Sequence, residues 1–154
     1  MNLRQITNKD QIELKKVYFD SILSIDENIY NKDQKIAWSS QAWDNPIFEN
    51  SIKKGKGWLI TDKNKIIGFA IRYPVNRISL FYCIGRAQRM GYGSILLNKI
   101  ENEAKEEGLH SLFTEASLIS YKLFIKNRWR IISKEKIIIK NNLFERYKMI
   151  KIFN

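Results

Sequence analysis

The sequence contains few of the residues on which many protein frameworks depend. It has one cysteine, one histidine and two prolines among 154 residues. The single cysteine, Cys83, excludes an intrachain disulfide and a metal site built from several thiolates. No apolar run approaches the roughly 20 residues that a membrane helix requires, and residues 1–5 lack the apolar character of a secretory signal. We therefore expect a cytoplasmic protein without disulfides, bound metal or a membrane span.

Acidic residues are also scarce relative to basic ones. Sixteen aspartates and glutamates stand against 27 lysines and arginines, which gives a formal charge of +11. Such an excess fits a nucleic acid, an anionic membrane surface or a phosphorylated ligand. The basic residues are scattered along the chain, and the longest pure basic runs are pairs such as Lys15-Lys16. We interpret most of them as solvated surface, so neither a nucleic acid nor a membrane is the expected partner.

The composition and length of the chain are sufficient for one globular domain. Hydrophobic residues make up 44% of the chain and charged residues 28%, both near the average for globular proteins. Folding of a chain of this length buries roughly 70% of its unfolded surface, which provides a real core. No repeat, low-complexity segment or linker divides the sequence. We therefore predict a single domain over residues 1–154.

Hydrophobic periodicity predicts strands and helices along the first half of the chain. Asn8 is a suitable N-cap for a helix that begins at Lys9, and Ile12, Val17 and Ile22 lie on one side of that helix. The predicted elements are a strand at 3–6, this first helix, a helix at 30–38, a short amphipathic segment after Pro46, and a hairpin of strands at 58–61 and 66–72.

The second half continues as a mixture of sheet and helix. Leu97, Ile100 and Ala104 follow helical spacing, and Gly108 provides a C-terminal stop. The predicted elements are a strand at 77–84, a helix at 91–107, a strand at 109–115, a helix at 117–127, and a hairpin of strands at 129–140 and 143–153. The predicted fold class is therefore α/β, an α+β mixed sheet with helices on both faces.

The segment between the strand at 77–84 and the helix at 91–107 carries the clearest chemical signal. It reads Ile84-Gly85-Arg86-Ala87-Gln88-Arg89-Met90-Gly91-Tyr92-Gly93-Ser94. The N–H groups of a first helical turn are unpaired, and the helix dipole adds positive charge, so phosphate binds there. Arg86 and Arg89 add charge-assisted hydrogen bonds. The segment lacks the endings of a nucleotide P-loop and of a dinucleotide site; a tight turn that needs small residues is the alternative.

Six residues of this segment match a known motif. Gln88-Arg89-Met90-Gly91-Tyr92-Gly93 resembles the Gln/Arg-x-x-Gly-x-Gly/Ala acetyl-CoA motif of the GNAT superfamily of N-acetyltransferases. The predicted order of elements over nearly the whole chain is also similar to that superfamily's order: strand, two helices, three strands, helix, strand, helix and two strands. Ile67-Gly68-Phe69-Ala70 and Thr114-Glu115-Ala116-Ser117 resemble a bacterial subgroup whose substrates are mostly undefined.

The resemblance implies acetyl-CoA as the cosubstrate. It places the backbone of Leu80 to Ile84 beside the pantetheine arm and the amides from Gln88 to Ser94 around the pyrophosphate. Ser117 stands where the family has an asparagine, and Phe124 stands where the family has a tyrosine that protonates the leaving thiolate. The cofactor-binding residues expected on this basis are Tyr82, Cys83, Ile84, Arg86, Gln88, Arg89, Met90, Gly91, Tyr92, Gly93, Ser94, Ser117 and Phe124.

Two catalytic residues are expected. Deprotonation of a lysine-like amine at pH 7 costs roughly 4 to 5 kcal/mol, so acyl transfer requires a base. Glu115 ends a strand that opens onto the thioester in this fold and is the candidate base, although a structural carboxylate is the alternative. Phe124 has no acidic proton, so either Tyr121 on the same helix replaces it as the acid, with Tyr82 as another possible donor, or the thiolate leaves without a dedicated acid. A backbone N–H near residues 82–84 is expected to stabilise the oxyanion.

Aromatic residues early in the chain suggest an acceptor pocket. Tyr30, Gln34 and Trp38 are spaced by four and also resemble a feature of the bacterial subgroup. They are predicted to bind the acceptor substrate, and packing against the sheet is an equal alternative. His110 begins a strand just after a glycine and is interpreted as a surface or edge residue. Cys83 is interpreted as buried filler, because no histidine and carboxylate partners can be assigned to it.

The sequence thus predicts an N-acetyltransferase that uses acetyl-CoA to acetylate a primary amine of a small molecule or protein by direct transfer in a ternary complex. One alternative is an acyl-CoA-binding module with little or no turnover. Another is a transferase that acts on aminoacyl-tRNA, which only the net charge favours. Edge strands of the C-terminal hairpin would allow a homodimer.

Overall fold

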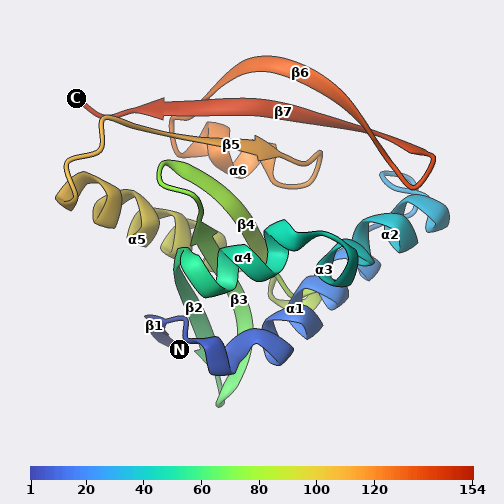
Figure 1. Ribbon diagram of the computed structural model, residues 1–154, viewed down its shortest axis with the longest axis horizontal. Helices are drawn as coiled ribbons and strands as arrows, with labels where there is room; N and C mark the ends of the chain where they lie inside the picture. Colours follow the sequence, from blue (N-terminus) through green and yellow to red (C-terminus); the bar gives the residue numbers. More distant parts are fainter.

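The computed structural model describes residues 1–154, which form one seven-stranded mixed sheet between two helical layers. The strand order is β1-β2-β3-β4-β5-β7-β6, and only the β4–β5 pair is parallel. Figure 1 shows β1 to β4 in the lower part of the view and β5, β7 and β6 above them. The predicted α/β class, with helices on both faces of a mixed sheet, is confirmed.

The chain builds one helical layer before it completes the sheet. The elements of the first half are β1 (Asn2–Gln5), η1 (Asn8–Asp10), α1 (Gln11–Leu23), α2 (Lys32–Ser39), α3 (Gln41–Asp44), α4 (Pro46–Lys54), β2 (Lys56–Asp62) and β3 (Lys65–Arg72). The elements of the second half are β4 (Arg77–Cys83), η2 (Gly85–Ala87), α5 (Tyr92–Glu106), β5 (Ser111–Ala116), α6 (Tyr121–Lys126), β6 (Arg130–Ile139) and β7 (Asn142–Ile152).

Strand alternation separates two hydrophobic cores. Leu80 and Phe69 face α1 and α4, and they pack with Leu14 and Phe48 of those helices. Side chains of the opposite parity pack under α5 and α6 on the other face. The buried members of that second core include Ile60, Ile67, Ala70, Ile78, Leu96, Leu97, Ile100, Leu112, Phe124, Trp129 and Met149.

The sheet opens between β4 and β5. These strands pair only at Arg77 with Phe113 and at Ile78 with Thr114. Ser79 then forms a bulge, because Arg72 of β3 lies opposite Ile78 while the preceding β3 residue lies opposite Leu80. A bulge bends its strand and ends regular pairing. The rest of β4 therefore diverges from β5 and leaves its outer backbone edge without a partner strand.

The start of the first helix differs from the prediction. Thr7 and not Asn8 is the N-cap of η1, and the carboxylate of Asp10 accepts a hydrogen bond from the Thr7 N–H at 2.8 Å. Hydrogen bonds from Arg4 to Asp10 lower the pKa of this carboxyl group. Ile12 was expected on the buried side of the helix but is 70% exposed. Regular α-helix begins only at Gln11, after the η1 turn.

Two further helices are shorter than predicted. Tyr30 precedes α2, whose N-cap is Asn31 in a reciprocal capping box with Gln34. α6 begins at Tyr121 and not at Ser117, because the Ser117 hydroxyl accepts hydrogen bonds from the N–H groups of Ile119 and Ser120 and closes a turn. None of the helices combines the length and apolar character needed to cross a membrane.

Candidate active site

The loop between β4 and α5 presents a row of unpaired backbone donors. The N–H groups from Arg89 to Ser94 make no hydrogen bond within the protein; the first N–H of α5 that does is that of Ile95, which donates to the Gly91 carbonyl at 3.3 Å. Successive free N–H groups at a helix N-terminus form an anion-binding concavity. The loop can therefore hold a phosphate group through its main chain.

Backbone conformation explains the glycine at the start of the helix. Gly91 is the N-cap of α5 and has φ +88°, a left-handed value that a side chain disfavours. A Cβ atom at Gly91 would meet nothing within 4 Å, so the space in front of the loop is open. At Gly93, in contrast, a Cβ atom would lie 2.8 Å from Leu123 of α6. Gly93 is therefore required for close packing of the two helices.

Two arginines add positive charge to the loop, and two hydrogen bonds hold it in place. Arg86 and Arg89 are exposed and make no ion pair. The Gln88 side chain donates to the Cys83 carbonyl at 3.2 Å, and the Gly85 N–H donates to Asp20 of α1 at 2.9 Å. These contacts fix the loop against the end of β4 and against α1. The predicted loop residues thus come together at one site.

The open edge of β4 leads away from this loop. The Ile84 N–H points toward β3, so the Cys83 carbonyl before it faces away from β3 and accepts a hydrogen bond from the Gln88 side chain. The Ile84 N–H donates to Ile67 of β3 at 2.9 Å and is not free to stabilise an oxyanion. The sequence suggests a backbone N–H near residues 82–84 for stabilising the oxyanion. Only an N–H group on the side of β4 that faces β5 is free for this purpose. The unpaired edge beyond the Ser79 bulge provides such positions.

A cavity of about 370 Å³ lies on the opposite side of this edge, under α1 to α4. Ser79 and Leu80 line it from β4, and Glu115 and Ser117 line it from the end of β5. The cavity therefore adjoins the opening between the two strands. Its remaining lining residues are Tyr18, Tyr30, Trp38, Gln41, Asn45, Ile47, Phe48, Arg77, Tyr82, Ile137, Ile138, Ile139, Phe144, Glu145 and Arg146.

Two of the three residues predicted to bind the acceptor line this cavity. The rings of Tyr30 and Trp38 are 5.3 Å apart and face it. Gln34 lies outside it: its carbonyl accepts from the Asn31 N–H at 2.8 Å, and its amide donates to Leu143 of β7 at 2.9 Å. Gln34 therefore joins α2 to the C-terminal hairpin.

The candidate base is held in an ion pair on the cavity floor. Oε2 of Glu115 accepts a hydrogen bond from Nε of Arg77 at 2.9 Å, and the Glu115 side chain is 17% exposed. Oε1 of Glu115 makes no hydrogen bond within the protein. The pair joins β4 to β5 just before the strands diverge. Both the predicted base and the alternative of a structural carboxylate are consistent with this position.

Tyrosine hydroxyls around the cavity are held protonated. Burial raises the pKa of Tyr82 to about 12, and burial also raises the pKa of Tyr30. The Tyr30 hydroxyl accepts a hydrogen bond from the Leu118 N–H at 2.9 Å. The Tyr18 hydroxyl donates to the Trp38 carbonyl at 2.7 Å. These phenols are therefore neutral at physiological pH, and the proton of Tyr18 is already engaged by the Trp38 carbonyl.

Three predicted site residues lie on the other face of the sheet, where α5 and α6 pack: Tyr121 and Phe124 belong to α6, and Cys83 belongs to β4. Phe124 is 1% exposed and its ring packs 5.4 Å from Phe81, so it is a core residue. The Tyr121 ring stacks on Tyr147 at 4.6 Å, and its hydroxyl makes no hydrogen bond within the protein. Cys83 packs against the same core, and burial raises the pKa of its thiol to about 11.

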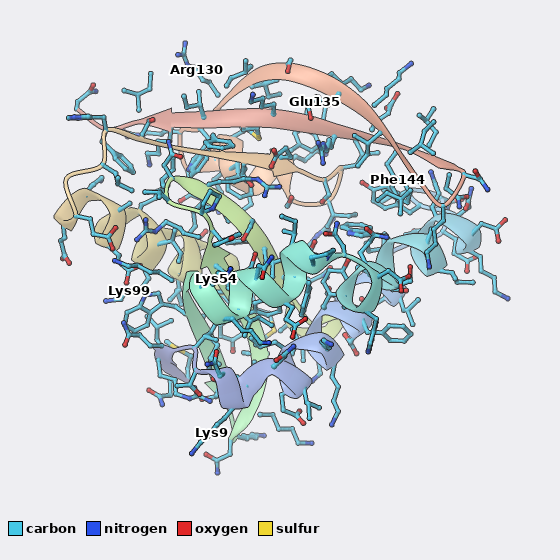
Figure 2. All side chains as sticks on the ribbon, viewed as in Figure 1. Lys9, Lys54, Lys99, Arg130, Glu135 and Phe144 are labelled. Atoms are coloured by element: carbon cyan, nitrogen blue, oxygen red, sulfur yellow. The ribbon has the colours of Figure 1, made fainter.

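Several cavity residues were not expected from the sequence. The C-terminal hairpin reaches over α2, and Figure 2 shows the labelled Phe144 near the hairpin turn, beside α2. Phe144, Glu145 and Arg146 are consecutive residues of β7, and all three line the cavity. No local sequence signal marks them, because the position of the hairpin over α2 is not encoded locally. No group of histidine, cysteine, aspartate or glutamate side chains comes together that could hold a metal ion.

Comparison with solved structures shows the same fold. A GCN5-related N-acetyltransferase from Rhodopseudomonas palustris has a TM-score of 0.91 and 21% identity, over 99% of this chain and 95% of its own. PaiA N-acetyltransferase from Thermoplasma acidophilum, in complex with coenzyme A, has a TM-score of 0.74 and 15% identity; the match covers 99% of this chain and 100% of that protein. YncA from Salmonella typhimurium, with acetyl-CoA, has a TM-score of 0.68 and 13% identity; the match covers 100% of this chain and 94% of that protein.

Sequence comparison identifies the family. No curated protein matches the chain. The family model of the Acetyltransferase (GNAT) family, in contrast, matches residues 20–125, a span that includes the loop, the open strand edge and the candidate base. The chain therefore belongs to the GNAT acetyltransferase family.

Proposed function

We propose that this chain is a single-domain, acetyl-CoA-dependent N-acetyltransferase that acetylates a primary amine by direct transfer. The observation that carries the proposal is the row of acceptor-free N–H groups from Arg89 to Ser94, next to the opening between β4 and β5. The site fits coenzyme A, because free donors and the unpaired Arg86 suit its pyrophosphate while an open strand edge suits its amide-containing arm. Coenzyme A in the PaiA structure and acetyl-CoA in the YncA structure support this assignment.

The two faces of the sheet divide the reaction between them. Acetyl-CoA supplies an activated acetyl thioester; transfer breaks its C–S bond, forms a C–N bond and releases one proton from the amine. The loop at Gly91 holds the phosphates on one face, and the cavity near Glu115 receives the amine on the other. The two substrates meet at the opening between the strands, so no covalent enzyme intermediate is required.

Glu115 and Tyr121 are the proposed catalytic residues. Oε1 of Glu115 is free to accept the amine proton, directly or through water, while Arg77 holds the carboxylate in place through Oε2. Tyr121 lies on the cofactor face with a hydroxyl that has no partner, so it is available to protonate the leaving thiolate. Phe124 is unable to perform this step because it has no acidic proton.

A substitution at Gly91 tests the phosphate loop. In Gly91→Val, the side chain occupies open space in front of the donors and disfavours φ +88°. Because each charge-assisted hydrogen bond contributes about 1.5–3 kcal/mol, we expect acetyl-CoA affinity to fall at least tenfold in calorimetric titration. Dephospho-CoA and ATP measure the generic attraction of anions to a basic surface.

Gly108 provides a matched control at the other end of α5. It has φ +82° and equally open space around a Cβ atom, so Gly108→Val introduces a similar backbone strain far from the loop. We expect this variant to bind acetyl-CoA as the unmodified protein does. Equal affinity in both variants contradicts the assignment of the loop. Saturable binding with no transfer to any amine instead supports a binding module without turnover.

A further inference from the structure

The acceptor cavity has an aromatic wall. The Trp38 ring lies 5.3 Å from Tyr30, 6.2 Å from Tyr82 and 6.3 Å from Phe144, and these residues come from four separate segments of the chain. Tyr30 is 2% and Phe144 is 5% exposed. Buried rings held by edge-to-face contacts give a rigid apolar surface with little entropy to lose on binding. This wall suits a large apolar group on the acceptor.

Two guanidinium groups in the same cavity are only partly used. Arg77 donates from Nε to Glu115, and Arg146 donates from Nε to Glu135, each at 2.9 Å. The terminal nitrogens of both arginines make no hydrogen bond within the protein. Their side chains are 24% and 31% exposed. A guanidinium group with free terminal nitrogens matches a carboxylate in two parallel hydrogen bonds.

The carboxylates of the cavity, in contrast, already have cationic partners. Glu115 is paired with Arg77, and Glu145 is paired with Lys134 at 3.0 Å. A polyamine needs unpaired carboxylates for its additional ammonium groups. Both carboxylates of the cavity are paired, and the free Oε1 of Glu115 serves the reacting amine, so the remaining unused groups are the guanidinium nitrogens, which suit an anion.

We infer that the acceptor amine also carries a carboxylate and a large apolar side chain, as an aromatic or branched α-amino acid does. The terminal nitrogens of Arg77 and Arg146 bind the carboxylate, and the rings around Trp38 bind the side chain. A volume of about 370 Å³ is near the lower end for ligand pockets and suits a small molecule. This inference rests on the proposed function for its assignment of the amine as the reacting group.

Matched acceptors isolate the contribution of the carboxylate. L-phenylalanine, L-phenylalaninamide and phenethylamine share one side chain and differ in the group that meets the arginines. We expect kcat/KM for L-phenylalanine to exceed that for each analogue at least about tenfold, because a bidentate charged contact is lost in both. The amide has a less basic amine, which favours its acetylation and works against the expected order. Equal or greater kcat/KM for the amide overturns the inference.

Variants of Arg146 and its partner identify the group responsible. Arg146→Gln removes the guanidinium group, whereas Glu135→Gln breaks the same ion pair but keeps that group in place. We expect the ratio of kcat/KM between L-phenylalanine and its amide to fall at least about fivefold in Arg146→Gln, as for the loss of one charged contact, and to persist in Glu135→Gln. An unchanged ratio in Arg146→Gln contradicts the assignment.

A binding measurement separates this inference from the proposed function. N-acetyl-L-phenylalanine keeps the carboxylate and side chain but has no reactive amine, and N-acetyl-L-phenylalaninamide is its neutral control. Calorimetric titration of the unmodified protein is expected to show at least about tenfold tighter binding of the carboxylate form. That preference without acetyl transfer supports the inference and contradicts the proposed function. Acetyl transfer to amines without that preference supports the function and overturns the inference.

Discussion

At the residue scale, the Arg77–Glu115 pair on the cavity floor is the most direct test of the chemistry. Glu115→Gln keeps the size of the side chain but removes its capacity to accept a proton. We expect kcat to fall about 10²-fold, the lower range for loss of a general base. The KM for acetyl-CoA is expected to change little, because Glu115 lines the cavity on the face opposite the phosphate loop. Steady-state kinetics with a saturating amine measures both parameters.

Thermal unfolding is the control for Glu115→Gln. The substitution weakens a partly buried ion pair, with side chains 24% and 17% exposed, so a modest loss of stability is expected. A folded variant with unimpaired kcat assigns Glu115 the structural role that was the alternative. A folded variant with lower kcat and unchanged acetyl-CoA affinity supports its role as the base.

The sequence motif marks the candidate phosphate loop as one continuous segment, whereas tertiary contacts decide where the other candidate residues lie. Gly91 and the donors after it belong to one continuous segment, so the motif alone located them. Gln34 has the spacing of a pocket residue, yet it bonds to Leu143, a residue distant in the sequence. The importance of Arg77 and Arg146 also depends on which of their nitrogens the fold leaves unpaired. Such information is absent from a linear pattern.

At the element scale, turn residues correctly predicted where strands and helices end, whereas helix starts were mispredicted where side-chain hydrogen bonds or a 3-10 turn precede the regular helix. The hairpin of β2 and β3 and the stop at Gly108 follow from turn residues, and both are confirmed. The predicted helix at 117–127 is shorter because hydroxyl groups of Ser117 and Ser120 bond to nearby backbone N–H groups or to each other. Ile12 faces solvent because the η1 turn precedes regular α-helix.

Arg72 provides a test of how α5 is attached to the sheet. Its side chain on β3 is 2% exposed, and Nη2 bonds to Glu103 at 3.2 Å and to Glu107 at 2.8 Å on α5. Arg72→Met keeps an apolar stem but leaves two carboxylates without this partner. We expect the free energy of unfolding to fall by about 3 kcal/mol. The lower part of the usual range applies because Nε of Arg72 is buried without a partner.

Denaturant unfolding of Arg72→Met measures this loss. Lys53→Met is the matched control, because the pair of Lys53 with Glu49 on α4 is about half exposed on both sides. We expect that control to change the free energy of unfolding by less than about 0.5 kcal/mol. Similar losses in both variants indicate that the buried contacts of Arg72 do not anchor α5.

At the scale of the whole molecule, the opening that forms the site divides the sheet into two parts. β1 to β4 are joined to β5 to β7 by only two paired positions, at Arg77 and Ile78. The family resemblance predicted the order of strands and helices along the chain, but the Ser79 bulge that ends this pairing has no local signal. The few hydrogen bonds and the Arg77–Glu115 ion pair that cross between β4 and β5 must therefore be supplemented by side-chain packing.

The core beneath α5 provides that packing, so we predict that the molecule unfolds in one cooperative step. Ile60 and Ile67 contribute from β2 and β3, Leu112 and Met149 contribute from β5 and β7, and Ile100 lies among them on α5. Far-ultraviolet circular dichroism and tryptophan fluorescence are expected to give coincident transitions, because Trp58 and Trp129 pack against this core from the two parts.

Ile100→Ala tests whether this core joins the two parts. Ile100 is fully buried, so its truncation is expected to lower the free energy of unfolding by about 2–5 kcal/mol. Variants that keep only Trp58 or only Trp129 report the two parts separately, and Ile100→Ala is expected to shift both fluorescence midpoints equally. Two separate midpoints, or a shift in only one of them, contradict a single cooperative domain. In that case the opening between β4 and β5 is a boundary between independently unfolding units.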